Sequence, residues 1–375
     1  MAEIKLLELF GGIGAPRKAL ENLGVNVKSI DYVEILPQAV NAYNAMFDNN
    51  YKTQDIKNWD LNVDILVHGS PCQDWSSAGL NDVTTGRSIL YQKTLDIIEN
   101  DLKPRPKVII WENVKALTQG NNRQYFKHYL KKLEELGYEN FYDILNSLDF
   151  GIPQSRERVF VVSIRKDLKV KFDFDNLERK EMRPLIDFLD NDPKIETAEY
   201  DVTQPSMLKS LENGKTKVII SNTATITTKM VRWNNAGVIF KDFKNFYTYP
   251  RKSDGKLING NYNRAWKSDR YIGTLTVKEI QKIGLVKDEE LKFRYLTPRE
   301  CFKLMGFSDS DFDKVMLKGI PKTRLYALAG NSIVVNVLEA IFKELLNIID
   351  FTHKPRQVNY TYFGQMELFE KRKQL

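Results

Sequence analysis

The chain has 375 residues, 42% hydrophobic and 28% charged, so it has enough apolar material for a packed core and exceeds the usual size of a single one. Its two cysteines are too few for a disulfide scaffold and form no zinc pattern with its three histidines, which favours a reducing compartment. No basic and apolar leader opens the sequence, and no apolar stretch approaches the roughly 18 residues needed to span a bilayer. We therefore expect a cytoplasmic protein.

The net charge of +7 is concentrated in one region of the chain. Residues 203–282 hold 15 Lys and Arg against 5 Asp and Glu, a net of +10, which leaves −3 for the remainder. Nine aromatic residues are interleaved with these cations, a combination suited to phosphate contact and base stacking. A solvated lysine-rich surface with ordinary core aromatics would have the same composition, so both interpretations stay open here.

Residues 1–165 alternate short apolar runs with amphipathic stretches, the pattern of a doubly wound α/β sheet. The expected strands are 5–9, 27–33, 65–68, 108–112, 141–146 and 159–164, and the expected helices are 15–23, 37–47, 88–100 and 123–136. From about residue 179 the sequence becomes polar and turn-rich, and an apolar helix is expected at 333–349. We therefore predict an α/β domain in 1–178, a smaller irregular domain in 179–322, a returning segment in 323–350 and a polar tail in 351–375.

A glycine-rich turn, residues 9–14 (LFGGIG), follows the first expected strand and lets a nucleoside cofactor approach the backbone and a helix N-terminus. The third glycine of the dinucleotide fingerprint would fall on Arg17, which argues against NAD or FAD. Glu34, twenty residues after Gly14, could accept hydrogen bonds from ribose hydroxyls, and Asp55 could bind an adenine. Each acid could equally be a surface loop residue.

Cys72 follows a short apolar strand in the run HGSPCQ, at the sheet edge where ligands bind in open α/β folds. Its rigid and polar surroundings favour an exposed nucleophile, which would react as a thiolate, over a small buried hydrophobe. Glu112 ends another strand at this edge and could act as an acid or bind a ring nitrogen. Arg156 and Arg158 point the same way if the segment is extended, so both could serve one site.

Six motifs stand in order along the chain: FGGIG (10–14), PCQ (71–73), ENV (112–114), QxRxR (154–158), LTPRE (296–300) and GNS (330–332). This ordered set resembles the cytosine-C5 DNA methyltransferase family of bacterial or phage restriction-modification systems, over about residues 4–345. The resemblance implies a Rossmann-like domain that binds S-adenosylmethionine, which residues 323–350 complete, and target recognition by residues 179–322. Thr274-Leu275-Thr276 is similar to a short Thr-Leu element of the family's recognition region.

The resemblance also implies a role for each site residue. Cys72 would add to C6 of a flipped-out cytosine, Glu112 would engage N3 and the exocyclic amine, and Arg158 would steady the base and hold Glu112, with Arg156 close by. No residue is assigned as the acceptor of the C5 proton. The implied contacts of S-adenosylmethionine, whose product is S-adenosylhomocysteine, are Phe10, Gly12, Gly14, Glu34 (ribose), Ile35 and Asp55 (adenine), Asn331 and Ser332.

The implied partner is double-stranded DNA, bound by a monomer, and a cognate restriction endonuclease could share the target sequence. The loop from Gln73 to about Tyr91 is the candidate for closing over the flipped base. A tRNA-methylating relative shares the motifs, but that branch is compact where this chain has its long basic region. A catalytically inactive DNA-binding relative would not need Cys72, Glu112 and Arg158 together, and a nicotinamide dehydrogenase is opposed by Arg17.

Overall fold

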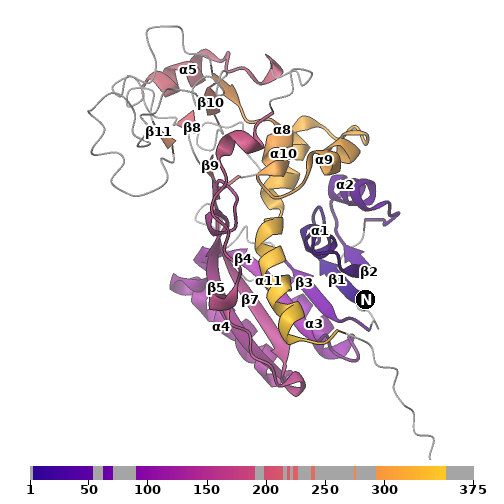
Figure 1. Cartoon of the computed structure of the whole chain (residues 1–375). Coiled ribbons are helices and arrows are strands. Elements are labelled where there is room, and N and C mark those ends of the chain that lie inside the picture. Colours follow the sequence, from indigo (N-terminus) through magenta and orange to yellow (C-terminus); the bar gives the residue numbers. More distant parts are fainter. Residues whose placement is uncertain are drawn as a thin grey trace, which may run out of the picture.

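The computed structural model describes residues 3–53, 62–70, 90–190, 198–213, 218–219, 223–226, 238–240, 274–275 and 293–351. Its centre is a mixed sheet with the strand order β2-β1-β3-β4-β7-β5 (Figure 1). The strands are β1 (Glu3–Leu9), β2 (Asn26–Val33), β3 (Ile65–His68), β4 (Val108–Val114), β5 (Tyr138–Asn146) and β7 (Glu157–Arg165). The apolar runs therefore predicted all six strands, to within three residues at each end.

Strand direction divides this sheet into two parts. β2, β1, β3 and β4 are parallel, whereas β7 is antiparallel to both of its neighbours, β4 and β5. The helices between the strands are α1 (Ala15–Asn22), α2 (Pro37–Phe47), α3 (Leu90–Asn100) and α4 (Arg123–Glu135). Only residues 147–156 join β5 to β7, too few for a helical crossover, so β7 returns antiparallel between β4 and β5. The expected two-sided α/β sheet is present, with an antiparallel edge.

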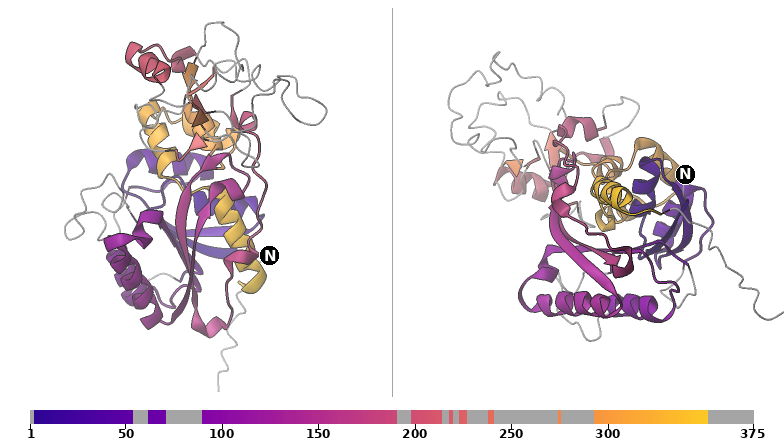
Figure 2. Two further views of the ribbon diagram at one scale, coloured as in Figure 1. Left: turned by 90° about the vertical axis from the view of Figure 1, so that its left-hand side faces the viewer. Right: turned by 60° about the horizontal axis from the view of Figure 1, so that its bottom comes forward.

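Helices cover both faces of the sheet because side chains alternate along each strand. Leu6 of β1 belongs to a core shared with α1, α2 and α11 (Val335–Ile348), whereas Leu7 belongs to a core shared with α3 and α4. Figures 1 and 2 show α11 and α4 on opposite sides of the sheet. Helix α11 packs directly on α1, so the end of the described chain completes a core that its first strand begins.

A second, smaller sheet has the order β11-β8-β10-β12. Its strands are β8 (Val218–Ile219), β10 (Val238–Phe240), β11 (Thr274–Leu275) and β12 (Phe293–Tyr295), and the helices of this part are α5 (Pro205–Glu212), α8 (Pro298–Lys303), α9 (Asp309–Met316) and α10 (Lys322–Asn331). Helix α9, inside the 179–322 range, packs on α2, where Lys314 donates to the Met46 carbonyl at 3.0 Å. The domain boundaries stay predictions.

The LTPRE motif builds the start of α8. Thr297 caps the helix by accepting from Glu300 N at 3.1 Å, while the Glu300 carboxylate accepts from Thr297 N at 2.7 Å. The same buried carboxylate forms a bidentate pair with Arg294 of β12, at 2.9 and 2.6 Å, and accepts from Asp190 N at 2.8 Å. This motif therefore joins the second sheet to the helices beside the main one.

One described stretch, Lys322–Ile348, is long and apolar enough by composition to cross a membrane, with a mean hydropathy of 1.6. This stretch contradicts the expectation that no apolar run approaches the length needed to span a bilayer. It comprises two helices, α10 and α11, and 67% of the apolar window is buried inside the protein. Its apolar character therefore serves the core around α1.

Candidate active site

The glycine-rich turn after β1 is shaped by backbone angles that side chains disfavour. Phe10, Gly12 and Gly14 have φ values of 56°, 54° and 78°, in the left-handed region. At Gly14, an added Cβ would lie 2.5 Å from the Phe47 ring and 2.6 Å from the Tyr43 ring. The close packing of α2 on this turn therefore requires glycine at residue 14, just before α1 begins.

The Glu34 carboxylate, at the end of β2, is bound to the backbone of this turn. Its Oε2 accepts from Gly12 N at 3.1 Å, and its Oε1 accepts from Ile35 N and Leu36 N, both at 2.9 Å. A carboxylate has about four acceptor positions, so Glu34 retains capacity for a hydroxyl. The Ile35 side chain beside it is 64% exposed, an unusual exposure for isoleucine that leaves an apolar surface beside this carboxylate.

A pocket at the carboxyl ends of β1, β3 and β4 brings together several predicted site residues. It is lined by Glu8, Leu9, Phe10, Gly11, Gly12, Ala15, Pro16, Val67, His68, Gly69, Glu112, Asn331, Ser332 and Ile333. Residues 331–333 follow from α10, where Asn331 is exposed and Ser332 is buried. Segments more than 300 residues apart in the sequence thus meet at one sheet edge, the usual ligand-binding edge of an α/β fold.

Glu112, which lines this pocket, forms an ion pair with Arg158. Glu112 lies on β4 and Arg158 on the adjacent β7, and Arg158 Nε lies 3.2 Å from Glu112 Oε1, with both side chains largely buried. Although these two atoms are close, Glu112 Oε1 accepts no hydrogen bond from the described residues. Glu112 Oε2 faces Gly69, where an added Cβ would lie 3.7 Å away. The Glu112 carboxylate therefore keeps acceptor positions for a ligand while it is paired with Arg158.

The backbone that leads to Cys72 is fixed by β4. Ser70 is buried; its hydroxyl accepts from Trp111 Nε1 at 3.0 Å and its carbonyl accepts from Asn113 Nδ2 at 3.1 Å. These bonds hold the end of β3 beside Glu112, two residues before Cys72. Cys72 itself, the loop after it and Asp55 lie outside the described residues.

Arg156 has different surroundings from Arg158, and the idea that both side chains serve one site stays a prediction. Its guanidinium donates to the carbonyls of Ile226, Gly330 and Ser332, at 3.1, 3.2 and 2.8 Å. The reason is that residue 156 lies between β6 (Gln154–Ser155) and β7, outside either strand, so strand alternation does not govern it. These three hydrogen bonds run to backbone carbonyls, whereas Arg158 pairs with the Glu112 carboxylate.

Comparison with known proteins decides the family. The sequence matches the family described as C-5 cytosine-specific DNA methylase over residues 4–347. This chain belongs to that family.

Among its relatives, the orphan methyltransferase M.SPRI of Bacillus phage SPR is 27% identical, across 92% of this chain and 98% of that protein. The type II methyltransferase M.NgoBI of Neisseria gonorrhoeae is 28% identical, across 96% and 98%. Solved structures of the Entamoeba histolytica methyltransferase EhMeth and of Schizosaccharomyces pombe Dnmt2 match the fold, with TM-scores of 0.68 and 0.65 at 19% and 20% identity. Each match covers 92% of this chain, together with 99% of the EhMeth chain and 98% of the Dnmt2 chain.

The chain is therefore a DNA cytosine-5-methyltransferase, which transfers a methyl group to C5 of cytosine. The family's mechanism uses a covalent cysteine adduct, and family membership implies S-adenosylmethionine as the methyl donor. The predicted Rossmann-like α/β methyltransferase fold is confirmed by the structural neighbours.

Two buried titratable groups that line the same pocket as Glu112 were not singled out from the sequence. Burial raises the pKa of Glu8 to about 7, although the Tyr43 hydroxyl donates to its Oε2 at 2.7 Å. Burial lowers the pKa of His68 to about 3, so its ring, 2.7 Å from the Tyr129 hydroxyl, is neutral. Both stand at the ends of expected core strands, where a charged or polar residue in an apolar run is the signal that could have found them.

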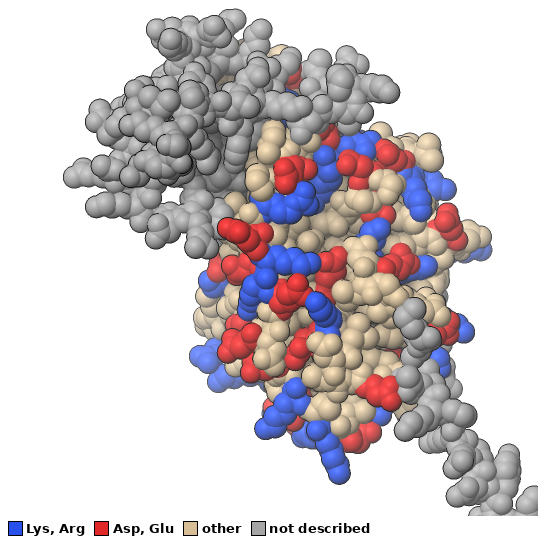
Figure 3. All heavy atoms as spheres, in the orientation of Figure 1, with Lys and Arg blue, Asp and Glu red and all other residues tan. Residues whose placement is uncertain are grey.

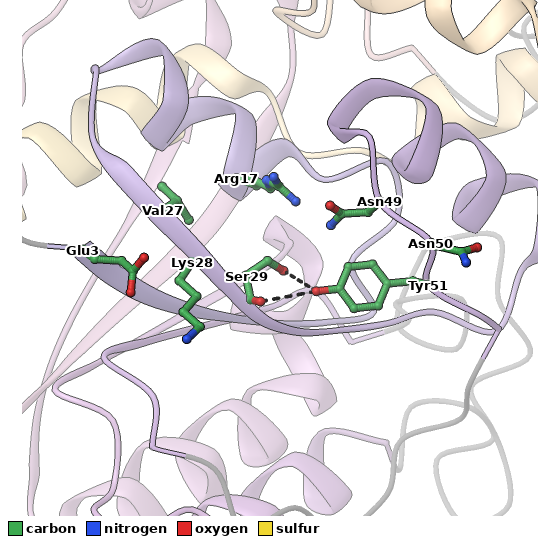
Figure 4. Close-up of a pocket in the computed structure, with 8 residues that line it drawn as sticks. All are labelled: Glu3, Arg17, Val27, Lys28, Ser29, Asn49, Asn50 and Tyr51. Atoms are coloured by element: carbon green, nitrogen blue, oxygen red, sulfur yellow. Dashed lines mark hydrogen bonds between the residues drawn. The ribbon is translucent and has the colours of Figure 1, made fainter.

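A larger hollow, about 470 Å³, lies at the β2 edge and shares no lining residue with this pocket (Figure 4). It is lined by Glu3, Arg17, Val27, Lys28, Ser29, Asn49, Asn50 and Tyr51. The Tyr51 hydroxyl donates to Ser29, and none of the predicted site residues is part of this lining. Residues of the FGGIG, ENV and GNS motifs line the other pocket and none lines this hollow, so the smaller pocket is the candidate active site.

Proposed function

We propose that Cys72, Glu112 and Arg158 carry out the transfer on a flipped-out cytosine in a specific duplex sequence. The observation that carries this proposal is the Glu112–Arg158 pair, which opens into the pocket that also holds the glycine-rich turn and Ser332. Flipping is required because C5 is inaccessible inside a duplex, and it costs a few kcal/mol that pocket contacts must offset.

In the proposed reaction, the Cys72 thiolate forms a bond to C6, and the electrons of the C5–C6 double bond make C5 nucleophilic. Glu112 carries a proton into this step: it donates to N3 and accepts from the exocyclic amine, and the proton offsets the negative charge that accumulates on the ring. Arg158 holds the Glu112 carboxyl in place and steadies the base. C5 then takes the methyl group, and loss of the C5 proton with expulsion of Cys72 restores the aromatic ring.

The described residues fit S-adenosylmethionine, which supplies an electrophilic methyl group when bound. The left-handed turn leaves open space beside Gly12, where an added Cβ would meet nothing within 4 Å, and Glu34 is held where a ribose hydroxyl could reach it. Exposed Ile35 offers an apolar face for an adenine. We assign cofactor contacts to these residues and to Phe10, Asp55, Asn331 and Ser332.

We assign target recognition to residues 179–322, and DNA contact above all to the basic stretch 203–282. On the face in Figure 3, the described Lys and Arg are interspersed with Asp and Glu, which agrees with a basic excess located in that stretch. We further propose a monomeric, cytoplasmic enzyme whose target sequence is shared with a restriction endonuclease, as the restriction-modification type implies.

The test incubates the protein with methyl-labelled S-adenosylmethionine and either mixed-sequence duplex DNA or bulk tRNA, followed by digestion to nucleosides. We expect label in 5-methyldeoxycytidine and its complete loss in Cys72→Ser, and sequencing of the product gives the target. Label confined to tRNA would assign the chain to the tRNA-methylating branch. DNA binding without transfer to either substrate would favour a non-catalytic relative.

A further inference from the structure

Arg156 joins segments of the chain that are far apart in sequence. Its side chain is 5% exposed, and the three carbonyls that accept from it belong to Ile226, Gly330 and Ser332. The last two terminate α10, where helix carbonyls lack partners within the helix and favour a cation. A buried guanidinium with three such bonds fixes the end of α10 firmly.

Gln154 holds the other end of the same connection. Its side-chain oxygen accepts from Ile226 N at 3.0 Å, and its amide donates to the Leu304 carbonyl at 2.8 Å. Gln154 and Arg156 therefore engage both backbone groups of Ile226. Around them, β6 pairs with β9 (Thr223–Ala224) and the Thr225 hydroxyl donates to the Ser155 carbonyl at 2.9 Å, so residues 223–226 lie along residues 154–156 as one unit.

Each end of this connection leads to a different proposed binding site. The α10 end carries Asn331 and Ser332, which line the pocket beside Gly12 and Glu112. Residues 223–226 lie inside the 179–322 range to which we assign DNA recognition. Two residues after Arg156, Arg158 pairs with Glu112. A displacement of residues 223–226 by bound DNA would thus be transmitted to the cofactor pocket through Arg156.

We propose that Arg156 is a positioning residue that couples cofactor binding to DNA binding, by holding the end of α10 in register with residues 223–226. The inference rests on the proposed assignment of the cofactor and DNA sites. Coupling of this kind is reciprocal. S-adenosylhomocysteine should therefore tighten DNA binding by the same factor as DNA tightens S-adenosylhomocysteine binding. Arg156 acts through backbone carbonyls, so its loss should change this factor, whereas loss of Arg158 should change the chemical step.

The experiment measures the dissociation constant of the methylated target duplex, identified by the labelling test, with and without S-adenosylhomocysteine. Calorimetry gives S-adenosylhomocysteine affinity without DNA. In wild type we expect the dissociation constant of the duplex without S-adenosylhomocysteine to be about ten times that with it, or more. This quotient is the coupling ratio. Arg156→Lys cannot span the three carbonyls, so we expect about tenfold weaker S-adenosylhomocysteine binding and a ratio close to one.

Gln154→Met tests one end of the connection alone. In this variant Arg156 still holds the end of α10, whereas Ile226 N loses its acceptor. We expect near-normal S-adenosylhomocysteine affinity in this variant and a reduced ratio. Arg158→Lys should keep the ratio and lose turnover, and Arg183→Lys, at an exposed arginine paired with Asp187, should match wild type throughout. Thermal melts confirm that each variant is folded.

A wild-type ratio of one, or an unchanged ratio in both Arg156→Lys and Gln154→Met, would overturn the proposal. So would loss of turnover in Arg156→Lys with normal binding of both ligands, since that result would assign Arg156 to the reacting base. Failure of the proposed function itself is distinguished from these outcomes, because it appears as the absence of labelled 5-methyldeoxycytidine with the wild-type protein.

Discussion

At the scale of single residues, the pairing of Glu112 with Arg158 was predictable from sequence, whereas the position of Arg156 was not. Glu112 and Arg158 lie on neighbouring strands, and both are in family motifs of known order. Arg156 stands in the short link before β7, where its direction depends on what packs against it. A side chain in an irregular link is therefore placed by tertiary contacts that its local sequence does not encode.

The first prediction concerns turnover. Glu112→Gln and Arg158→Lys should each lower the rate of methyl transfer by about 10²- to 10⁴-fold. Glu112→Gln removes the carboxyl that offsets charge on the ring, and Arg158→Lys removes the guanidinium that aligns that carboxyl. Glu157→Gln is the matched control, since Glu157 is a half-exposed neighbour paired with Lys115. Single-turnover transfer of labelled methyl measures the step. Equal rates for Glu112→Gln and Glu157→Gln would remove Glu112 from the chemistry.

The second prediction concerns pH and the buried Glu8. Its pKa rises from 4.5 to about 7 on folding, so the folded state binds this proton more tightly than the unfolded state. That stabilisation is complete below pH 4.5 and is lost as pH rises through 7, a difference of about 3 kcal/mol in the free energy of unfolding. Glu8→Gln should remove this dependence and stabilise the protein at pH 8.

Urea unfolding of wild type and Glu8→Gln at pH 5 and pH 8 provides the measurement. The two proteins should be close in stability at pH 5 and diverge at pH 8. A constant difference between them at both pH values would mean that Glu8 does not take up a proton on folding.

At the scale of elements, sequence predicted where the strands lie better than how they run. Apolar alternation marks a buried strand equally well in either direction, so periodicity did not distinguish β5 and β7 from the parallel strands. The length of the link did contain the information, because residues 147–156 are too few to carry a crossover helix. The short pairings of β6 with β9 and of β8 with β11 could not be predicted, because they depend on chain segments brought together by the larger sheet.

The third prediction compares two glycines at the ends of one helix. Gly14 and Gly24 both have positive φ, but an added Cβ meets the Tyr43 and Phe47 rings only at Gly14. Gly24→Ala should cost about 1 kcal/mol for the backbone strain alone, whereas Gly14→Ala should cost a further 1–3 kcal/mol, roughly, from overpacking. Urea midpoints give both values, and calorimetry should show weaker S-adenosylhomocysteine binding only for Gly14→Ala. Equal losses of stability would contradict the packing argument.

At the scale of the whole molecule, residues of three motifs, FGGIG, ENV and GNS, meet at one pocket, although they are spread from residue 10 to residue 332. The family resemblance supplied this result, because no local pattern places Ser332 beside Gly12. What the motifs could not predict is how the second sheet is attached. That attachment depends on the buried Arg294–Glu300 pair and on Gln154, whose partners are mostly backbone groups of distant segments.

The fourth prediction tests that attachment. Glu300→Gln leaves the buried Arg294 without a counter-charge, so the free energy of unfolding should fall by about 3–5 kcal/mol. Asp187→Asn, which breaks the exposed pair with Arg183, should cost less than about 1 kcal/mol. Chemical unfolding monitored by tryptophan fluorescence and by circular dichroism measures both. A small loss for Glu300→Gln would show that hydrogen bonds to Thr297 and Asp190 suffice at this junction.

The packing of α11 on α1 has a consequence for synthesis on the ribosome. Strand β1 and helix α1 leave the exit tunnel early, yet the apolar face they present is covered only when residues 335–348 emerge. The nascent chain must carry that face uncovered while the more than 300 residues between α1 and α11 are made, with aggregation as the hazard. Slow translation or limiting chaperone should therefore reduce the soluble yield, and a stop codon just before α11 should give a chain that cannot complete its first core.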